Sequence, residues 1–478
     1  MRESGLPSRV INFGGNLEFC PAAIVAPRTE ADVLRILHEH RGRRIRAVGR
    51  LHSWSEAVVA EELLLDLRHL DQIDVRDDEQ GPVATVGAGC QIKRLLAELD
   101  RRGLTLPSVG LISEQSLAGA VATGTHGSGR SSLSHYVAGM RIACYDPVTD
   151  EPLIRQVRGG DELRAARCSL GCLGVVLSVD VRPRPAYRVE EWFRLHESLA
   201  EVLAAEPDAP LQQFFLIPWL WNFLGQHRRE STQPRSWLAP LYRAYWFAAI
   251  DVALHLVLRL IVRVLRRRGA IKGFFRHIAL RTVIRGWHVV DWSQRMLIME
   301  HELFRHIEIE MFVPQTHLPK AVTFVREILE AFDGDAASLS PETRAALTNL
   351  GRIDELQSAV ASYTHHYPIC IRRVFGDDTL ISMTSDSDEP YYAISFISYD
   401  RPVERDGFFR FARFLSDSMS ALFAARPHWG KVCPLTRDQA QRLYPNLPQF
   451  REQCVRFDRQ ARFGNAWLDR LCLGKPDS

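Results

Sequence analysis

Two glycine-bearing segments in the first third of the chain carry the clearest chemical signal. One covers residues 47–55 and reads AVGRLHSWS, and the other covers residues 117–129 and reads LAGAVATGTHGSG. Glycine and small hydroxyl residues allow backbone N–H groups to approach a phosphate closely. Two such segments can hold an extended dinucleotide from both sides. The pattern therefore predicts a cofactor that contains a pyrophosphate.

Other cofactor classes have less support in the sequence. No G-x-G-x-x-G motif follows a strand in the setting that a nicotinamide cofactor requires. The nine cysteines are scattered, and Cys168 and Cys172 do not form a CxxC pair. We therefore predict no metal site, and we expect reduced thiols in a cytoplasmic protein.

The segments around these motifs predict an α+β domain. Thr29 is a candidate N-cap for a helix that runs to about residue 40, and a second helix covers residues 91–101. Strands are expected at residues 44–48, 63–67, 83–86, 140–145 and 175–181. Short strands mixed with helices in this way do not follow the strict βαβ repetition of a dinucleotide-binding fold.

A second region, from residue 187 to residue 433, holds further strands. Residues 304–313 alternate in polarity and place Glu308 and Glu310 on one face. Strands at 368–374 and 391–398 follow, then a helix at about 408–424. The polar and aromatic residues 444–473 are expected to pack back on the first domain. We predict domains at residues 1–185, 186–440 and 441–478.

An apolar insertion at residues 237–290 complicates a purely soluble interpretation. Between residues 237 and 265 Asp251, His255, Arg259 and Arg263 recur four residues apart, on one helical stripe, and arginines occupy positions 266–268. A membrane-spanning helix would bury that stripe in lipid, at a free-energy cost on the order of several kcal/mol. Two interpretations stay open: an in-plane helix with its arginines at the headgroups, or a cap helix packed on the protein or on a partner.

Length and composition fit a folded protein of about two domains. The chain has 478 residues, of which 46% are hydrophobic and 24% charged. A net charge of +3 gives no support to nucleic-acid binding. The N-terminal residues lack the apolar core of a signal peptide. We therefore expect a cytoplasmic location, with membrane association as the alternative that the insertion raises.

The order of the motifs resembles a known family. The two glycine segments, followed by GCLGV at residues 171–175, are similar to the PCMH-type FAD-binding domain of the vanillyl-alcohol oxidase family, aldonolactone oxidase branch. The resemblance continues with HYP at 366–368, GDD at 376–378, RPHWGK at 426–431, and YP at 444–445. It covers nearly the whole chain. It implies an α+β fold with a PCMH-type FAD-binding domain and an α+β cap domain that contains an antiparallel sheet.

The resemblance also implies FAD as the cofactor and assigns residues to it. His52 matches the histidine that bonds covalently to the flavin 8α-methyl carbon. The cofactor-binding residues carried over are Gly49, His52, Ser53, Ser55, Gly119, Thr123, Gly124, Thr125, His126, Gly127, Ser128, Gly174, Val175 and Lys431.

Catalysis in this family is hydride transfer from a carbinol C–H to flavin N5. Lys431 is the cation expected near the flavin N1–C2=O edge, Arg372 is expected at the substrate hydroxyl, and His428 at the pocket floor. The implied enzyme oxidises a CH–OH group of a sugar-1,4-lactone, of the D-arabinono or L-gulono type, or of a polyol. The electron acceptor is O2 or another oxidant.

Two positions depart from the family pattern. Leu51 replaces the usual glycine before the flavin-linked histidine, so we expect an ordinary backbone conformation there or a slight shift of the loop. Cys370 replaces the glutamate of the family's Glu-x-Arg pair, and a thiol is a poor substitute for a carboxylate. Glu308, Glu310 or His366 are candidates to act instead. Two further functions stay open: oxidation of a lipid-linked or apolar alcohol at a membrane surface, and a catalytically idle, membrane-attached flavoprotein.

Overall fold

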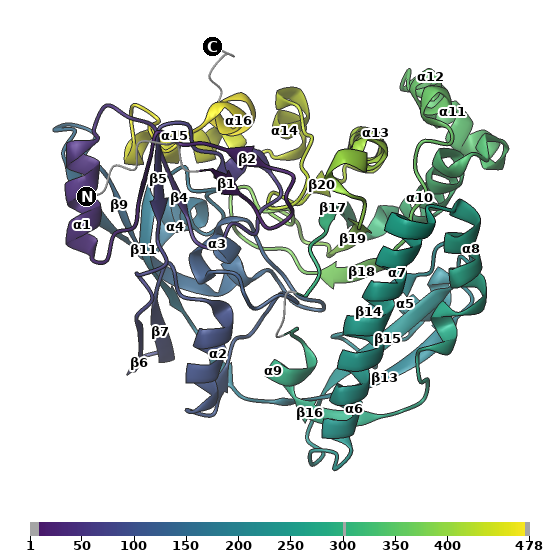
Figure 1. Cartoon of the computed structure of the whole chain (residues 1–478). Helices are drawn as coiled ribbons and strands as arrows, with labels where there is room; N and C mark the ends of the chain where they lie inside the picture. Colours follow the sequence, from purple (N-terminus) through teal and green to yellow (C-terminus); the bar gives the residue numbers. More distant parts are fainter. Residues whose placement is uncertain (1–8, 300–302, 474–478) are drawn as a thin grey trace.

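The computed structural model describes residues 9–299 and 303–473, arranged as two bodies (Figure 1). In the N-terminal body, a parallel three-stranded sheet has the order β3-β5-β4. Its strands are β3 (Ala23–Val25), β4 (Ile45–Val48) and β5 (Leu63–Asp66). Helix α1 (Glu30–Glu39) begins with the predicted cap, because the Thr29 side chain accepts from the backbone N–H of Asp32.

An antiparallel five-stranded sheet completes the N-terminal body in the order β10-β9-β11-β7-β6. Its strands are β6 (Ile73–Asp78), β7 (Gly81–Gly87), β9 (Val137–Tyr145), β10 (Pro152–Val157) and β11 (Val175–Val181). Helices α2 (Ile92–Asp100), α3 (Leu117–Ala122) and α4 (Gly160–Ala166) pack against the sheets through apolar side chains. The mixture of small sheets and helices confirms the predicted α+β class.

The cap is built on an eight-stranded sheet in the order β16-β13-β15-β14-β18-β19-β17-β20. Its strands are β13 (Arg188–His196), β14 (Gln213–Leu216), β15 (Phe223–Ser231), β16 (Val289–Trp292), β17 (Ile307–Pro314), β18 (Ile369–Val374), β19 (Tyr391–Ser398) and β20 (Arg426–Pro427). Every neighbouring pair in this sheet is antiparallel, as predicted for the cap.

Helices cover one face of the cap sheet and leave the other toward the N-terminal body. These helices are α10 (Leu318–Asp333), α11 (Pro341–Asn349), α12 (Ile353–Ala359) and α13 (Asp406–Phe423). Along β17 the odd-numbered residues from Ile307 to Val313 join this helix-covered core. Because side chains alternate along a strand, Glu308 and Glu310 point to the opposite face.

The insertion forms one long helix with changing hydrogen-bond pattern. It runs through α6 (Ala239–Tyr245), the π-helical segment Trp246–Leu254, α7 (His255–Leu260) and the π-helical segment Ile261–Leu265. The helix ends at Arg266, which takes a left-handed conformation, and α8 (Arg268–His277) follows. Within the described ranges, none of the helices has the length and apolar character that crossing a membrane requires.

The C-terminal segment returns to the N-terminal body (Figure 1). It contains α14 (Arg437–Leu443), α15 (Leu447–Phe457) and α16 (Ala466–Leu468). The backbone N–H of Ile45 donates to the carbonyl of Arg462 at 2.8 Å, beside the first glycine segment. Asn465 donates to the carbonyls of Glu56 and Val59, both at 2.9 Å. The end of the chain therefore braces the strand and loop that lead to His52.

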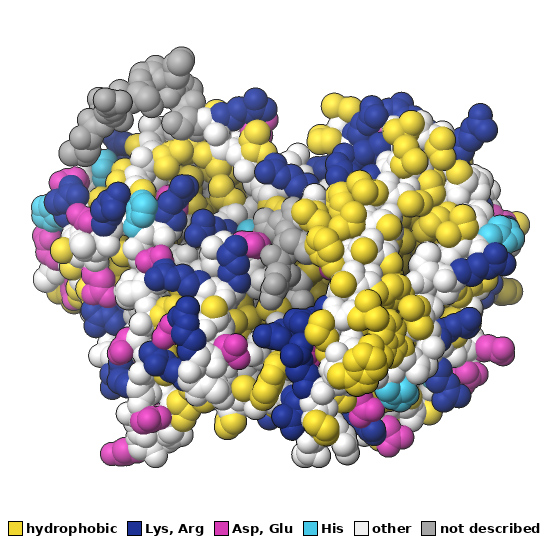
Figure 2. Space-filling view, turned by 60° about the horizontal axis from the view of Figure 1, so that its bottom comes forward, with side chains coloured by type: hydrophobic (Ala, Val, Ile, Leu, Met, Phe, Trp, Pro, Cys, Tyr) yellow, Lys and Arg dark blue, Asp and Glu magenta, His cyan; other side chains and the backbone are white. Residues whose placement is uncertain are grey.

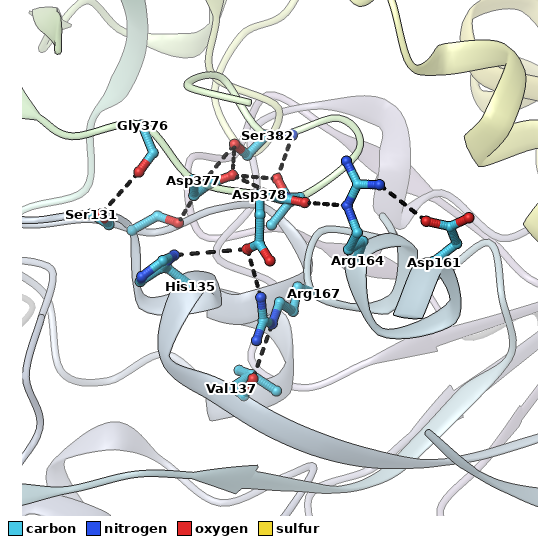
Figure 3. A network of polar contacts seen from close by, with 12 residues as sticks. Ser131, His135, Val137, Asp161, Arg164, Arg167, Gly376, Asp377, Asp378 and Ser382 are labelled. Atoms are coloured by element: carbon cyan, nitrogen blue, oxygen red, sulfur yellow. Dashed lines mark hydrogen bonds and ion pairs between the residues drawn. The ribbon is translucent and has the colours of Figure 1, made fainter. Parts of the chain in front are cut away.

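A buried acidic loop joins the cap to the N-terminal body (Figure 3). The Asp377 carboxylate accepts hydrogen bonds from the hydroxyls of Thr379, Ser382 and Ser132, the last from across the junction. Its neighbour Asp378 is half exposed and forms an ion pair with Arg167 at 2.6 Å. This network fixes the position of the loop against α4.

Candidate active site

A cavity of about 350 Å³ lies between the N-terminal body and the open face of the cap sheet. One wall is formed by residues from the segments 46–54, 110–126 and 170–176, which overlap the predicted glycine segments. The other wall consists of side chains from β14, β15, β17, β18 and β19. The fold thus brings segments that are far apart in the sequence to one cavity.

The first glycine segment follows β4 and contains one residue, Leu51, with a strained backbone conformation. Leu51 has φ +54°, so the prediction of an ordinary backbone conformation at this position is wrong. A left-handed leucine costs about 1–2 kcal/mol. The strain is offset because the Leu51 carbonyl accepts from the N–H of Phe13 at 2.8 Å and its side chain packs beside Val10 and Phe19. Leu51 therefore adopts the left-handed turn conformation that glycine could adopt without strain.

His52 lines the cavity immediately after this turn. Its ring is stacked on Phe13, with centroids 5.1 Å apart. The next residues bind the RPHWGK run, because the Trp54 N–H donates to the Gly430 carbonyl at 2.9 Å and Ser53 donates to the same oxygen at 3.3 Å. Two motifs separated by more than 370 residues of sequence therefore form one edge of the site.

A polar row crosses the cap sheet at the bottom of the cavity. Cys370 on β18 lies opposite Ser395 on β19, and Ser395 lies opposite Glu310 on β17. The Ser395 hydroxyl lies 2.7 Å from Glu310 Oε1 and 2.8 Å from Glu308 Oε1. All four side chains line the cavity. Glu310 therefore supplies a carboxylate at the same level of the sheet as Cys370, whose side chain has none.

The cationic residues of the site are also held in place. Lys431 forms an ion pair with Glu308 and lies over the Trp54 ring, 4.4 Å from its centroid. Arg372 Nε donates to Gln213 Oε1 at 3.0 Å. Both cations line the cavity, so each presents its charge to an occupant.

His428 is fixed as a hydrogen-bond donor toward the cavity. Its Nδ1 accepts from the Gly430 N–H at 2.9 Å, so in the neutral ring the proton is on Nε2. Burial lowers the pKa of His428 to about 3, an effect that nearby Lys431 reinforces. A neutral imidazole with Nε2–H donates a hydrogen bond and does not accept a proton.

Glu310 is the carboxylate of a buried cluster with His126 and His428. Glu310 Oε2 lies 3.4 Å from His126 Nε2, while His126 Nδ1 lies 2.9 Å from the Gly127 carbonyl. Burial alone would raise the pKa of Glu310, but His126, Lys431 and His428 hold it well below its usual value. The ligand atoms of the three residues lie within 4.8 Å of one another, a spacing that a metal ion can also use. The hydrogen bonds made by the two imidazole rings favour a network of shared protons over a metal site.

A group of apolar side chains also lines the cavity, and we call the part of the cavity beside them the apolar arm. The arm lies between the cap strands and the insertion helix, and it is lined by Phe193, Phe215, Ile217, Leu224, Trp246, Ile250, Leu254, Leu280, Val283 and Ile397. Two polar side chains of the helix, Asp251 and His255, also face the cavity. A chain of methylene groups fits such a wall better than a polyhydroxylated ring does.

The predicted polar stripe of the insertion helix faces the protein. His255 bonds to the hydroxyl of Tyr399, and Arg263 donates to the Tyr399 carbonyl at 2.7 Å. Arg259 lies over the ring of Phe304, 5.3 Å from its centroid. Arg259 and Arg263 therefore turn toward partners within the protein, which favours the interpretation of a cap helix packed on the protein.

Comparison with known families and proteins supports this site. Residues 21–146 match the family model described as "FAD binding domain", and residues 228–471 match that described as "D-arabinono-1,4-lactone oxidase". A protein named long-chain alcohol oxidase, from an uncultured marine euryarchaeote, is 51% identical over 460 residues, 96% of each chain. The chain belongs to the D-arabinono-1,4-lactone oxidase family.

More distant relatives of this family member also span its length. L-gulonolactone oxidase of Bos taurus is 23% identical and covers 96% of this chain and 97% of its own. L-gulono-1,4-lactone dehydrogenase of Mycobacterium tuberculosis is 25% identical and covers 96% and 98%. The solved structure of a solvent-stable cholesterol oxidase has TM-score 0.73 at 16% identity, with 97% of each chain covered, which shows the shared fold. The chain is therefore an FAD-dependent oxidoreductase that acts on CH–OH donors.

The first wall of the cavity fits FAD. Five glycines line it: Gly49, Gly110, Gly119, Gly171 and Gly174. At Gly49 an added Cβ would lie 1.9 Å from the Ser116 hydroxyl, so the two glycine segments can meet only without a side chain there. Glycine-lined backbone is what a pyrophosphate requires for close approach.

The predicted site residues divide into two groups in this oxidase. Those that line the cavity are Gly49, His52, Ser53, Gly119, Thr123, Thr125, His126, Gly174, Arg372, His428 and Lys431. Those outside the cavity lining are Ser55, Gly124, Gly127, Ser128 and Val175. Ser55 supports Ser53 at 3.0 Å, and Gly127 and Ser128 line a small neighbouring cavity. The alternative base His366 instead accepts from the Tyr399 N–H at 2.8 Å, away from the site.

Sequence reasoning missed several polar residues of the cavity. Ser395 lay within a predicted strand, but its place between Cys370 and Glu310 depends on strand order, which the sequence does not show. Gln213, Gln226 and Arg228 come from β14 and β15, which were not predicted. The two segments read QFFL and FLGQHRRES, and neither alternates polar with apolar residues, so they carry no period-2 strand signal.

Proposed function

We propose that this enzyme oxidises the terminal hydroxyl of a long apolar alcohol to the aldehyde. The observation that carries the proposal is the apolar arm, whose lining includes Trp246, Ile250 and Leu254 of the insertion helix. The printed name of the relative at 51% identity, long-chain alcohol oxidase, supports the same substrate class. Cys370, in place of a carboxylate suited to sugar hydroxyls, is consistent with it.

A sugar-1,4-lactone or polyol is the second candidate substrate. Gln213, Gln226 and Arg228 line the cavity and can bind hydroxyl groups. The names of the gulonolactone relatives support it at lower identity. If a sugar lactone or polyol is the substrate, it makes no contact with the apolar arm.

We propose the following division of roles in the reaction. When bound, FAD would supply the hydride acceptor that oxidation of a carbinol requires. Arg372 and the Nε2–H of His428 bind the substrate oxygen, and Lys431 supplies positive charge to the edge of the cofactor. Glu310 accepts the hydroxyl proton, because it is the ionised carboxylate closest in register to Cys370 and His428 lacks a free acceptor atom.

We propose that His52 holds FAD covalently. The support is its position on the cavity wall, after a turn that Leu51 keeps in the left-handed conformation.

We further propose that the domain boundaries lie near residues 185 and 440, and that the enzyme is cytoplasmic and contacts a membrane surface. O2 or another acceptor reoxidises the cofactor.

Comparison of specificity constants tests the substrate proposal. Purified holoenzyme is assayed with primary alcohols of increasing chain length, with L-gulono-1,4-lactone and with an alditol, using O2 and an artificial dye as acceptors. We expect kcat/KM to be highest for the long-chain alcohols. A preference for the lactone or the alditol would instead establish the second candidate, and no turnover with any of them would favour a catalytically idle flavoprotein.

A further inference from the structure

The insertion helix exposes a continuous apolar surface on the side away from the cavity. We call it the outer apolar face, and its members are Trp237, Leu241, Phe247, Leu256, Val257, Leu260, Val264 and Leu265, with Ile278 and Ile284 in the following segment. Their exposed fractions range from 38% to 86%. Figure 2 shows a broad hydrophobic area on the cap side of the molecule, bordered by lysine and arginine side chains. Surfaces of this kind mark contacts with a partner or a membrane.

The polarity of this helix is the reverse of that expected for a helix facing water. Its charged side chains turn inward: Arg243 reaches the buried Asp291 at 3.3 Å, Asp251 lines the cavity, and Arg263 binds the Tyr399 carbonyl. A surface helix in water places its polar residues outward. The outward apolar stripe therefore fits a surrounding that is itself apolar.

Basic side chains surround the outer apolar face. The exposed ones are Arg266, Arg267, Arg268, Arg276, Arg281 and Arg285. Between residues 237 and 290 the only acidic residue is Asp251, which is buried. An apolar face with a positive border is complementary to the acyl chains and headgroups of an anionic lipid surface.

The same helix separates this face from the apolar arm. Trp246, Ile250 and Leu254 line the arm on one side, and Phe247 is exposed on the other. The arm is also lined by Leu280 and Val283, which lie between the exposed residues Ile278 and Ile284. The wall of the arm and the outer apolar face therefore share one short segment, residues 278–284.

We infer that the outer apolar face docks on an anionic lipid bilayer and that the alcohol passes from the bilayer into the apolar arm beside residues 278–284. The docking surface follows from the exposed side chains alone, whereas the delivery step rests on the proposed substrate. An apolar alcohol resides mainly in lipid, so a docked enzyme meets it at high local concentration. Direct entry from the bilayer spares the alkyl chain passage through water.

Vesicle sedimentation with full-length holoenzyme tests the docking. The probes are phosphatidylcholine vesicles with and without phosphatidylglycerol. The test variant is Leu256→Glu combined with Leu260→Glu, and the matched control is Val148→Glu combined with Val455→Glu, at exposed valines outside the cap. We expect the wild type and the control to bind anionic vesicles, with weaker binding to phosphatidylcholine alone. The test variant should lose affinity by about tenfold or more.

Equal binding of the test variant and the wild type, or no wild-type binding, would overturn the docking. Light scattering of the same samples without lipid distinguishes the other occupant: a wild-type dimer that the test variant converts to a monomer would show that a second copy covers this face. Retained flavin absorbance and thermal unfolding show that each variant is folded.

Kinetics separate delivery from the reaction itself. The test variant should oxidise a long-chain alcohol embedded in anionic vesicles about tenfold more slowly than the wild type, because less of the enzyme is docked. It should match the wild type with a short, water-soluble alcohol. Equal rates on the embedded substrate would overturn delivery. A wild type that oxidises no alcohol would instead contradict the proposed function and leave the sedimentation result valid.

Discussion

Cys370 and Glu310 lie at the same level of the cap sheet, on either side of Ser395. Their strands are β18 and β17, separated by β19. The position where this family usually carries a glutamate thus holds a thiol, whose pKa burial raises. A carboxylate two strands away faces the same cavity. This relationship underlies our assignment of the proton acceptor.

Replacing Glu310 with glutamine should lower kcat by about 10²–10³-fold, because the amide cannot take the hydroxyl proton. Flavin content and the KM for alcohol should change little. Adding Cys370→Glu to this variant should recover part of the lost rate, since the new carboxylate lies on the same row of the sheet. Steady-state kinetics of the two variants check this, and a Glu310→Gln enzyme with wild-type kcat would contradict the role.

The acid limb of the pH profile distinguishes Glu310 from a histidine base. The pKa of Glu310 is lowered, so the carboxylate stays ionised as the pH falls through 7 and 6. We therefore expect kcat/KM to stay level down to about pH 5 and to fall only in more acidic solution. A decline centred near pH 6.5 would show that a histidine of ordinary pKa accepts the proton instead.

The His52→Ala variant should release its flavin on acid precipitation, whereas wild-type protein should keep the yellow colour in the pellet. The reason is that an alanine side chain cannot form the covalent bond, although the glycine segments still bind FAD. Yellow colour confined to the wild-type supernatant would show that no bond forms. Leu51→Gly is the matched variant: it removes the left-handed strain and the side-chain packing together, so the loop should keep its conformation and the bond should still form.

Chain length should control KM through the apolar arm. Each added methylene contributes about 0.8 kcal/mol on burial, so KM should fall about three- to fourfold per methylene until the arm is full. Leu280→Trp should shorten the arm and raise KM about tenfold or more for long alcohols while sparing short ones. A KM that is independent of chain length would place the alkyl chain outside the arm.

The Asp377 loop offers a stability test that does not touch the cavity. Asp377→Asn should lower the free energy of unfolding by about 2–3 kcal/mol, since a buried carboxylate that accepts several hydroxyl donors loses part of its acceptor capacity. Asp378→Asn, at the neighbouring half-exposed position, should cost about 1 kcal/mol or less. Denaturant unfolding of both variants checks the difference, and equal costs would show that Asp377 has no special role.

Much of the site could be predicted because its residues carry local signals. The glycine segments and the RPHWGK run mark backbone and charge requirements that are visible in sequence order. Other features depend on long-range packing. Leu51 adopts its conformation because Phe13 and Val10 hold it, and Ser395 joins the site because β19 lies between β17 and β18.

The orientation of the insertion helix also depends on long-range packing that the sequence pattern does not contain. Its four-residue spacing of Asp251, His255, Arg259 and Arg263 indicated one polar stripe, and the structure contains that stripe. Periodicity gives the stripe but not the direction in which it points. Here Tyr399 and Phe304 provide partners inside the protein, so the apolar side of the helix is the one left outside.

Anaerobic mixing of the oxidised holoenzyme with a substrate tests the central claim most directly. We predict that a saturating long-chain primary alcohol bleaches the flavin absorbance within one turnover and yields one equivalent of aldehyde. L-gulono-1,4-lactone at the same concentration should bleach it far more slowly. Rapid bleaching by the lactone, with none by the alcohol, would contradict the account.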